Sequence, residues 1–105
     1  MELKIVWTDF AKKELRLIFE YHRENPNPTI ARKLVSANAK ETLKLKNHPE
    51  IGQEEELLKN DTRCFRYLVF KDYKIIYLFN QEHNQIDIFD VFDTRQNPIK
   101  IARTK

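Results

Sequence analysis

The stretch that decides the fold is Arg63–Phe79, which has the sequence RCFRYLVFKDYKIIYLF. β-Branched and aromatic residues fill this stretch, and they predict two strands joined by a tight turn at Lys71-Asp72. No acidic residue lies in either predicted strand. Four basic residues belong to the stretch: Arg63, Arg66, Lys71 and Lys74. We therefore predict a sheet with a basic face, which suits an anionic partner.

The segment before this hairpin is predicted to supply one strand and two helices. Leu3–Trp7 alternates well enough for a short strand, with Leu3, Ile5 and Trp7 on one face. Thr8 or Asp9 offers an N-cap oxygen for a helix that ends near Glu24-Asn25, where prolines follow. Asn27-Pro28 then starts a second helix, with Asn as the N-cap and Pro at the first helical position. Both helices are amphipathic and form a helical hairpin.

The remaining elements complete a fold of the α+β class. Residues 48–56 are predicted as a loop around the only glycine, Gly52, and Ile86–Phe92 as the last strand. The order is strand, helix, helix, strand, strand, strand. We expect the helical hairpin to pack on a curled, mainly antiparallel four-stranded sheet. One domain then covers residues 1–105, with the sheet face opposite the helices partly open to a partner.

The composition is that of a soluble globular protein. The chain has 105 residues, of which 41% are hydrophobic and 33% charged, enough for a core of its own. No apolar run approaches the ~20 residues of a membrane span, and the first residues, which pass straight into a strand-like run, are not expected to be a leader. The single cysteine, Cys64, cannot form an internal disulfide, so a cytoplasmic location is expected. The net charge of +3 permits an anionic partner without showing one.

Common signatures of cofactor and metal sites are absent from the sequence. A chain with one glycine has no phosphate-binding loop or dinucleotide fingerprint. The three histidines, His22, His48 and His83, have no metal-ligand spacing, so neither metal nor cofactor is expected. Cys64 is predicted to be a buried apolar residue rather than a nucleophile. The run 54–56, three glutamates, is predicted to be solvated rather than to hold a general base.

The arginines are the stronger functional signal. Guanidinium groups suit phosphate oxygens because their planar fork offers paired donors. Arg63, Arg66, Lys74 and Arg95 come from separate elements that we expect to converge in the sheet. Strand alternation places Arg63 and Arg66 on opposite faces unless a bulge or twist intervenes. A phosphate-binding cluster and ordinary surface salt bridges both remain open at this point.

Several motifs in order resemble the RelE/ParE superfamily of bacterial toxins from type II toxin–antitoxin systems. They are Trp7 with the helix that follows, the loop His48–Gly52, the Arg-bearing strand followed by Tyr73–Tyr77, and the ending Asp93–Pro98. The resemblance covers nearly the whole chain. It implies the fold described above, and it implies growth inhibition that a cognate antitoxin neutralises.

The resemblance leaves two mechanisms. RelE-like members cut mRNA on the ribosome, and by position Arg63, Lys74 and Arg95 would match their catalytic cations. ParE-like members inhibit DNA gyrase. Many nuclease members carry a His or Tyr acid/base near the end, whereas the stretch Phe92–Arg95 has neither, which favours the ParE-like mechanism. An mRNA interferase, and a non-toxic member that only pairs with an antitoxin, remain the alternatives.

The expected partners are a cognate antitoxin protein and either DNA gyrase or the ribosome with mRNA, with no membrane. The residues expected to contact a protein or nucleic-acid partner are Arg63, Arg66, Lys71, Lys74 and Arg95. We expect the antitoxin to lie across the basic sheet face and the helical hairpin, where it would neutralise Arg63 and Arg95.

Overall fold

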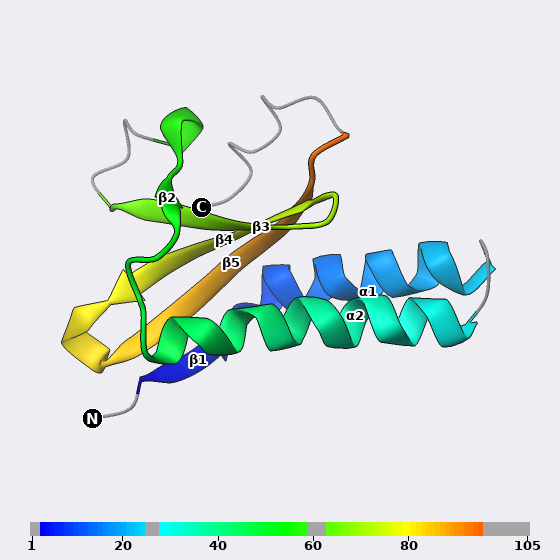
Figure 1. Cartoon of the computed structure of the whole chain (residues 1–105), viewed down its shortest axis with the longest axis horizontal. Coiled ribbons are helices and arrows are strands. Elements are labelled where there is room, and N and C mark those ends of the chain that lie inside the picture. The colour runs from blue at the N-terminus through cyan, green and yellow to red at the C-terminus, as the bar shows by residue number, and fades with distance from the viewer. Residues whose placement is uncertain (1–2, 25–27, 59–62, 96–105) are drawn as a thin grey trace.

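The structure is a computed structural model that describes residues 3–24, 28–58 and 63–95 (Figure 1). Its helices and strands are, in chain order, β1 (Lys4–Trp7), α1 (Asp9–Glu24), α2 (Pro28–Thr42), the 3₁₀ turn η1 (Leu43–Lys46), β2 (Gln53–Glu54), η2 (Glu56–Leu58), β3 (Phe65–Phe70), β4 (Tyr73–Asn80), η3 (Gln81–His83) and β5 (Gln85–Asp93). The sheet order is β1-β5-β4-β3-β2. β1 runs parallel to β5, and the other three pairs are antiparallel.

The predicted α+β class, the helical hairpin and the β3–β4 hairpin are confirmed, but the sheet has five strands where four were predicted. The additional strand is β2, which lies inside the predicted loop and pairs Gln53 with Tyr67 and Glu54 with Arg66. Both of its residues are exposed and polar, so it shows no apolar alternation. Only its backbone pairing with β3 makes it a strand.

The first helix begins at the predicted cap. The Thr8 hydroxyl oxygen accepts a hydrogen bond from the Ala11 N–H at 3.2 Å and donates one to the Ile88 carbonyl at 2.9 Å. One side chain therefore both caps α1 and fixes it to β5. α2 begins at Pro28, as predicted, while its predicted cap Asn27 lies outside the described residues.

The sheet has an apolar cluster on each face. The cluster under the helices consists of Ala11, Leu45, Ile75, Tyr77, Ile86 and Ile88. The cluster on the other face consists of Leu58, Phe65, Ile76 and Phe92. In Figure 1 both helices run along one side of the sheet, and η2 lies on the other. The face predicted to be partly open is covered in part by Leu58 of η2.

A register shift makes the second cluster possible. Ile76 pairs with Asp90 but Tyr77 pairs with Ile88, so Phe89 is an extra residue in β5. The Phe89 ring packs edge-on against Phe65, with 5.2 Å between the ring centroids. The bulge thus adds an aromatic ring to the face opposite the helices.

Gly52 holds the chain that leads into β2 against the sheet. Its N–H donates to the Tyr77 hydroxyl at 2.9 Å, and Arg66 Nη1 donates to its carbonyl at 2.9 Å. A Cβ at this position would lie 2.6 Å from the Tyr67 carbonyl oxygen and 2.7 Å from a Tyr77 ring carbon. The backbone approaches so closely that no side chain fits.

We predict that Gly52→Ala destabilises the protein by about 2 kcal/mol, because the added methyl must displace backbone of β3 or the buried Tyr77 ring. Urea unfolding measures this change. Ser36→Ala, at an exposed position of α2, is the control and should change the midpoint little. Equal midpoints for the two variants would show that the Gly52 contact is not tight.

We also predict a loss of stability in alkali that depends on Tyr77. Burial raises the pKa of Tyr77 above its ordinary value of 10.0, although the hydrogen bond from Gly52 opposes the shift. A raised folded pKa means that the stabilisation is complete below pH 10 and is lost as pH rises through the folded pKa. Urea unfolding at pH values from about 8 to 10.5 should therefore show a larger loss of stability for the unmodified protein than for Tyr77→Phe. Parallel losses in the two proteins would contradict the assignment to Tyr77.

Candidate functional site

Arg63 and Arg66 lie near the start of β3 but have different partners. Arg66 reaches the loop before β2, where it donates to the Gly52 carbonyl and places Nη2 3.7 Å from a Glu50 carboxylate oxygen. The Arg63 guanidinium lies 4.8 Å from the Phe65 ring centroid and 5.7 Å from that of Phe89. Both arginines line one shallow pocket of about 450 Å³.

Lys74 lies on the sheet face opposite the helices and contacts a buried acid. Its Nζ is 3.2 Å from Glu55 Oε2 and 4.4 Å from the centroid of the Tyr67 ring. Glu55 is only 2% exposed. The Tyr67 hydroxyl in turn donates to Gln53 Oε1 at 3.0 Å. Lys74 therefore belongs to an ion pair with a largely desolvated carboxylate.

This pair corrects the prediction that residues 54–56 are all solvated. Glu54 and Glu56 are exposed, as predicted, but Glu55 is buried. The backbone pairing of β2 with β3 continues one residue further, because the Glu55 N–H donates to the Phe65 carbonyl at 3.0 Å. Strand alternation then turns Glu55 inward while its two neighbours face solvent.

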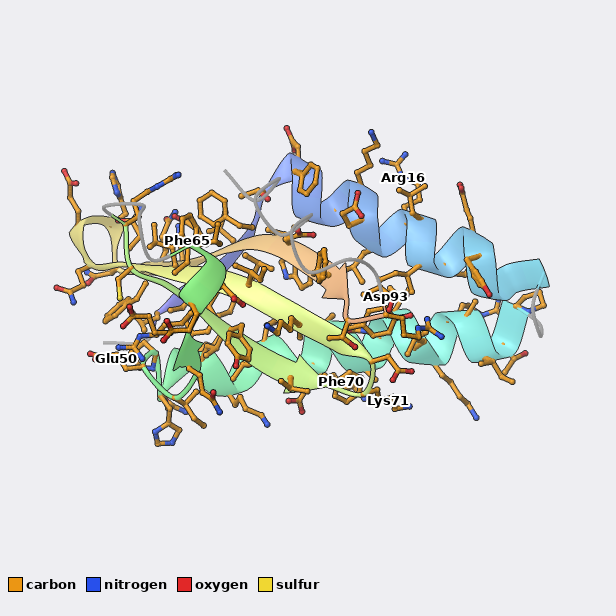
Figure 2. All side chains as sticks on the ribbon, turned by 90° about the horizontal axis from the view of Figure 1, so that it is seen from above. Arg16, Glu50, Phe65, Phe70, Lys71 and Asp93 are labelled. Atoms are coloured by element: carbon orange, nitrogen blue, oxygen red, sulfur yellow. The ribbon has the colours of Figure 1, made fainter. Side chains whose placement is uncertain are left out.

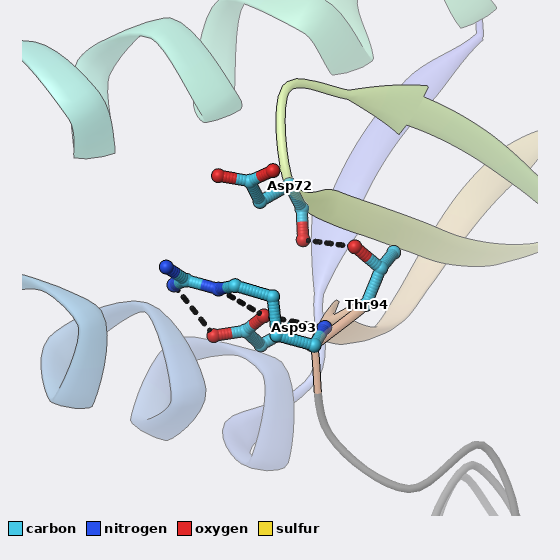
Figure 3. A network of polar contacts seen from close by, with 4 residues as sticks. Asp72, Asp93 and Thr94 are labelled. Atoms are coloured by element: carbon cyan, nitrogen blue, oxygen red, sulfur yellow. Dashed lines mark hydrogen bonds and ion pairs between the residues drawn. The ribbon is translucent and has the colours of Figure 1, made fainter.

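Arg95 lies beyond the end of β5 and is held by Asp93. Arg95 Nε donates to Asp93 Oδ1 at 3.0 Å and Nη2 to Oδ2 at 2.8 Å (Figure 3). These hydrogen bonds raise the pKa of Arg95 above its ordinary value. The neighbouring Thr94 donates to the Asp72 carbonyl from both its N–H and its hydroxyl, at 2.8 and 2.9 Å. The segment after β5 is thus tied to the β3–β4 turn.

The predicted cationic residues do not form one cluster. Figure 2 shows Lys71, Phe70 and Asp93 toward one end of the molecule, and Glu50 and Phe65 toward the other. Arg63 and Arg66 share a pocket at the Phe65 end, Lys71 and Arg95 share one at the turn end, and Lys74 pairs with Glu55 on the sheet face. The expected convergence of these residues is therefore not what the structure has.

Sequence reasoning missed the acidic partners of these cations. The position of Asp93 two residues before Arg95 was a usable local signal, whereas the pairing of Glu55 with Lys74 depends on β2, which has no sequence signature. Cys64, predicted to be buried, is exposed because β3 begins one residue later, at Phe65. Burial and the nearby Asp93 raise the pKa of Tyr73, a further residue that the sequence did not single out.

Within residues 3–24, 28–58 and 63–95, no group of three or more His, Cys, Asp or Glu side chains could hold a metal ion. Neither α1 nor α2 has the length and apolar character needed to cross a bilayer.

A comparison with models of known protein families identifies the family of this chain. The model of the family described as ParE toxin of the type II toxin–antitoxin system parDE matches residues 5–98. The chain belongs to the ParE toxin family. The resemblance to the RelE/ParE superfamily predicted from the sequence motifs is thereby confirmed.

A solved structure agrees with the ParE assignment at the level of the fold. A chain from the chromosomal ParDE toxin–antitoxin system of P. aeruginosa superposes with a TM-score of 0.72 at 16% sequence identity. The match covers 87% of the present chain and 95% of the other. A comparison with curated proteins found no match.

For this ParE family member, we predict that Lys74→Met costs about 2 kcal/mol of stability, because it removes the ammonium that lies 3.2 Å from the buried Glu55 carboxylate. This figure is below that for fully buried pairs because the Lys74 side chain is 25% exposed. Urea unfolding should show that the double variant Lys74→Met/Glu55→Gln recovers most of the loss.

The matched control for this pair is Lys12→Met, at an exposed position of α1, which should be nearly neutral. If Lys74→Met lowered the free energy of unfolding no more than Lys12→Met does, the ion pair would not stabilise the β2 region.

Proposed function

We propose that the chain is a growth-inhibiting toxin that acts by binding DNA gyrase and is neutralised by a cognate antitoxin. Membership of the ParE family supports a toxin of a type II system. The observation that carries the choice of mechanism is the internal pairing of the cations. Lys74 pairs with Glu55, Arg95 with Asp93, and Arg66 with the Gly52 carbonyl and Glu50.

This pairing disfavours RNA cleavage. Cleavage by attack of the 2′-hydroxyl needs a base for that hydroxyl, cations for the phosphorane and an acid for the leaving oxygen. A phosphate approaching Lys74 or Arg95 would meet the carboxylate already bound there. Glu55 and Asp93 would repel it, so the cations are poorly placed to stabilise added negative charge. Binding to a protein target makes no such demand.

One observation favours the mRNA interferase as the second candidate. Arg63 stacks over the Phe65 and Phe89 rings beside a shallow pocket. Aromatic and guanidinium planes are the surfaces on which nucleic-acid bases stack. This arrangement could bind RNA without cutting it. It therefore supports the mRNA interferase less strongly than the paired cations disfavour it.

Two observations support an antitoxin as the partner: a similar solved structure and exposed apolar side chains on the helices. The similar P. aeruginosa chain comes from a ParDE toxin–antitoxin system. The present chain also exposes large apolar side chains on its helices, including Leu17 at 47% and Tyr21 at 57%. Exposed apolar residues grouped in this way mark protein-binding surfaces.

We predict that the purified chain inhibits supercoiling by purified DNA gyrase and leaves mRNA on translating ribosomes intact. Supercoiling is followed by gel electrophoresis of a relaxed plasmid, and mRNA by mapping of 5′ ends. The chain premixed with its antitoxin is the control, and it should leave supercoiling unaffected. Codon-periodic cleavage without gyrase inhibition would overturn the proposal in favour of the interferase. Neither effect, with the antitoxin still bound, would favour a non-toxic member.

A further inference from the structure

The positive charge of the chain is concentrated on α2 and η1. Residues 28–46 contain one acidic residue, Glu41, and five basic residues: Arg32, Lys33, Lys40, Lys44 and Lys46. The whole chain has 19 basic and 16 acidic residues, which leaves 14 basic and 15 acidic residues elsewhere. The segment from α2 to η1 therefore accounts for all of the net positive charge.

Four of these basic residues form an exposed stripe, here called the α2 face: Arg32, Lys33, Lys40 and Lys44. Lys33 and Lys40 lie seven residues, or two helical turns, apart, so they share one side of α2. Arg32 is next to Lys33, and Lys44 follows in η1. At a rise of about 1.5 Å per residue, the stripe is roughly 20 Å long. Figure 1 shows α2 beside α1 along one side of the sheet.

The neighbouring helix α1 has no such excess of charge. Residues 9–24 contain four basic and four acidic residues. Lys13 follows Asp9 by four positions, and Arg16 precedes Glu20 by four, so each of these cations has an acid one helical turn away. The two helices of the hairpin therefore differ in their electrostatic character, although both have a solvent-facing side.

The cations of the α2 face lack such neighbours. No acidic residue lies three or four positions from Arg32, Lys33 or Lys40. In the described part of the chain none of these three side chains forms an ion pair, whereas Lys44 pairs with Glu41 at 2.9 Å. Three cations on one rigid helix are therefore available to an anion from outside the chain.

The stability of α2 does not explain the placement of these cations. A helix dipole favours acids in the first turn and cations in the last. α1 follows this rule with Asp9, but α2 has no acid in its first turn, and its first charged residues are Arg32 and Lys33. Lys40, in the last turn, does suit the dipole. An external anion is therefore the better explanation for Arg32 and Lys33.

The composition of the α2 face favours a duplex over a single strand. Residues 28–46 include no aromatic residue, so this segment offers no ring on which an unstacked base could stack. A duplex presents its phosphates instead, at intervals of about 3.4 Å along each strand. Roughly six phosphates of one strand span the length of the stripe. A linear array of cations on a helix suits such an array of anions.

We propose that the α2 face binds the phosphate backbone of duplex DNA without reading its sequence. Contacts from Lys and Arg to phosphates position a protein on DNA but carry no sequence information. This contact goes beyond gyrase inhibition, and it is a property of the chain by itself. In a toxin that acts on gyrase, it would hold the toxin beside the DNA on which the enzyme acts.

The test is the fluorescence anisotropy of a labelled duplex of about 20 base pairs, titrated with the purified full-length chain in about 50 mM salt. Arg32→Glu/Lys40→Glu should weaken binding by about tenfold or more, because it places two acids in the stripe. Lys12→Glu/Arg16→Glu is the matched control, because it reverses one exposed lysine and one exposed arginine on α1. The control should change the Kd by less than about threefold.

The dependence on salt measures the number of phosphates that the chain neutralises. Three phosphate contacts predict a slope of about −2.7 for log K against log salt. The slope should approach zero for Arg32→Glu/Lys40→Glu and should stay unchanged for Lys12→Glu/Arg16→Glu. Thermal unfolding should be nearly the same for all three proteins, because the substituted positions are exposed. A loss of binding would then not reflect a loss of fold.

Three results would overturn the α2 face as a DNA contact. The first is an equal loss of affinity in the two double variants, which would mean that total charge decides binding. The second is tighter binding to single-stranded DNA or RNA of the same length than to the duplex. The third is binding to vesicles of phosphatidylglycerol and phosphatidylcholine without binding to the duplex, which would assign the face to a membrane surface.

The failure of this contact is distinguishable from the failure of the proposed function, because its test uses neither gyrase nor an antitoxin. Duplex binding through the α2 face by a chain that does not inhibit gyrase would leave the DNA contact in place and overturn only the gyrase mechanism. Gyrase inhibition by a chain that binds no duplex would overturn only the DNA contact.

Discussion

The close approach of Gly52 to the sheet is the constraint on which the rest of the structure depends. Because position 52 has no side chain, its backbone can lie between the Tyr67 carbonyl and the Tyr77 ring and hydrogen-bond to Tyr77 and Arg66. The chain then enters β2 in register with β3. Three residues after Gly52, Glu55 turns into the protein beneath Lys74. Gly52 thus helps to set the partners of two cations, Arg66 and Lys74.

The location of charge says more about function here than its total. The net charge of +3 would suit RNA, but Lys74, Arg66 and Arg95 are bound to acids or carbonyls of the same chain. Removing such an acid would expose a cation, whereas adding a phosphate would require two negative groups at one cation.

The sequence predicted what local interactions determine. The β3–β4 hairpin follows from its run of strand residues, the Thr8 cap from a hydroxyl before an amphipathic stretch, and the start of α2 from Pro28. The sequence could not predict what distant contacts decide. β2 exists only through its pairing with β3. The Phe89 bulge arises only from the register between β4 and β5. The burial of Glu55 depends on both the close approach of Gly52 and the pairing of β2. The basic residues were expected to converge, and they do not, for the same reason: the sequence shows the basic residues but not their acidic partners.

We propose that internal pairing of the cations, rather than a lack of positive charge, disfavours RNA binding by this ParE family member. The most direct measurement is the fluorescence anisotropy of a labelled single-stranded RNA at low salt, with the unmodified chain and with Glu55→Gln/Asp93→Asn. We expect weak binding by the unmodified chain and tighter, salt-sensitive binding once the two acids are neutralised. Tight binding by the unmodified chain that the double variant does not improve would contradict it.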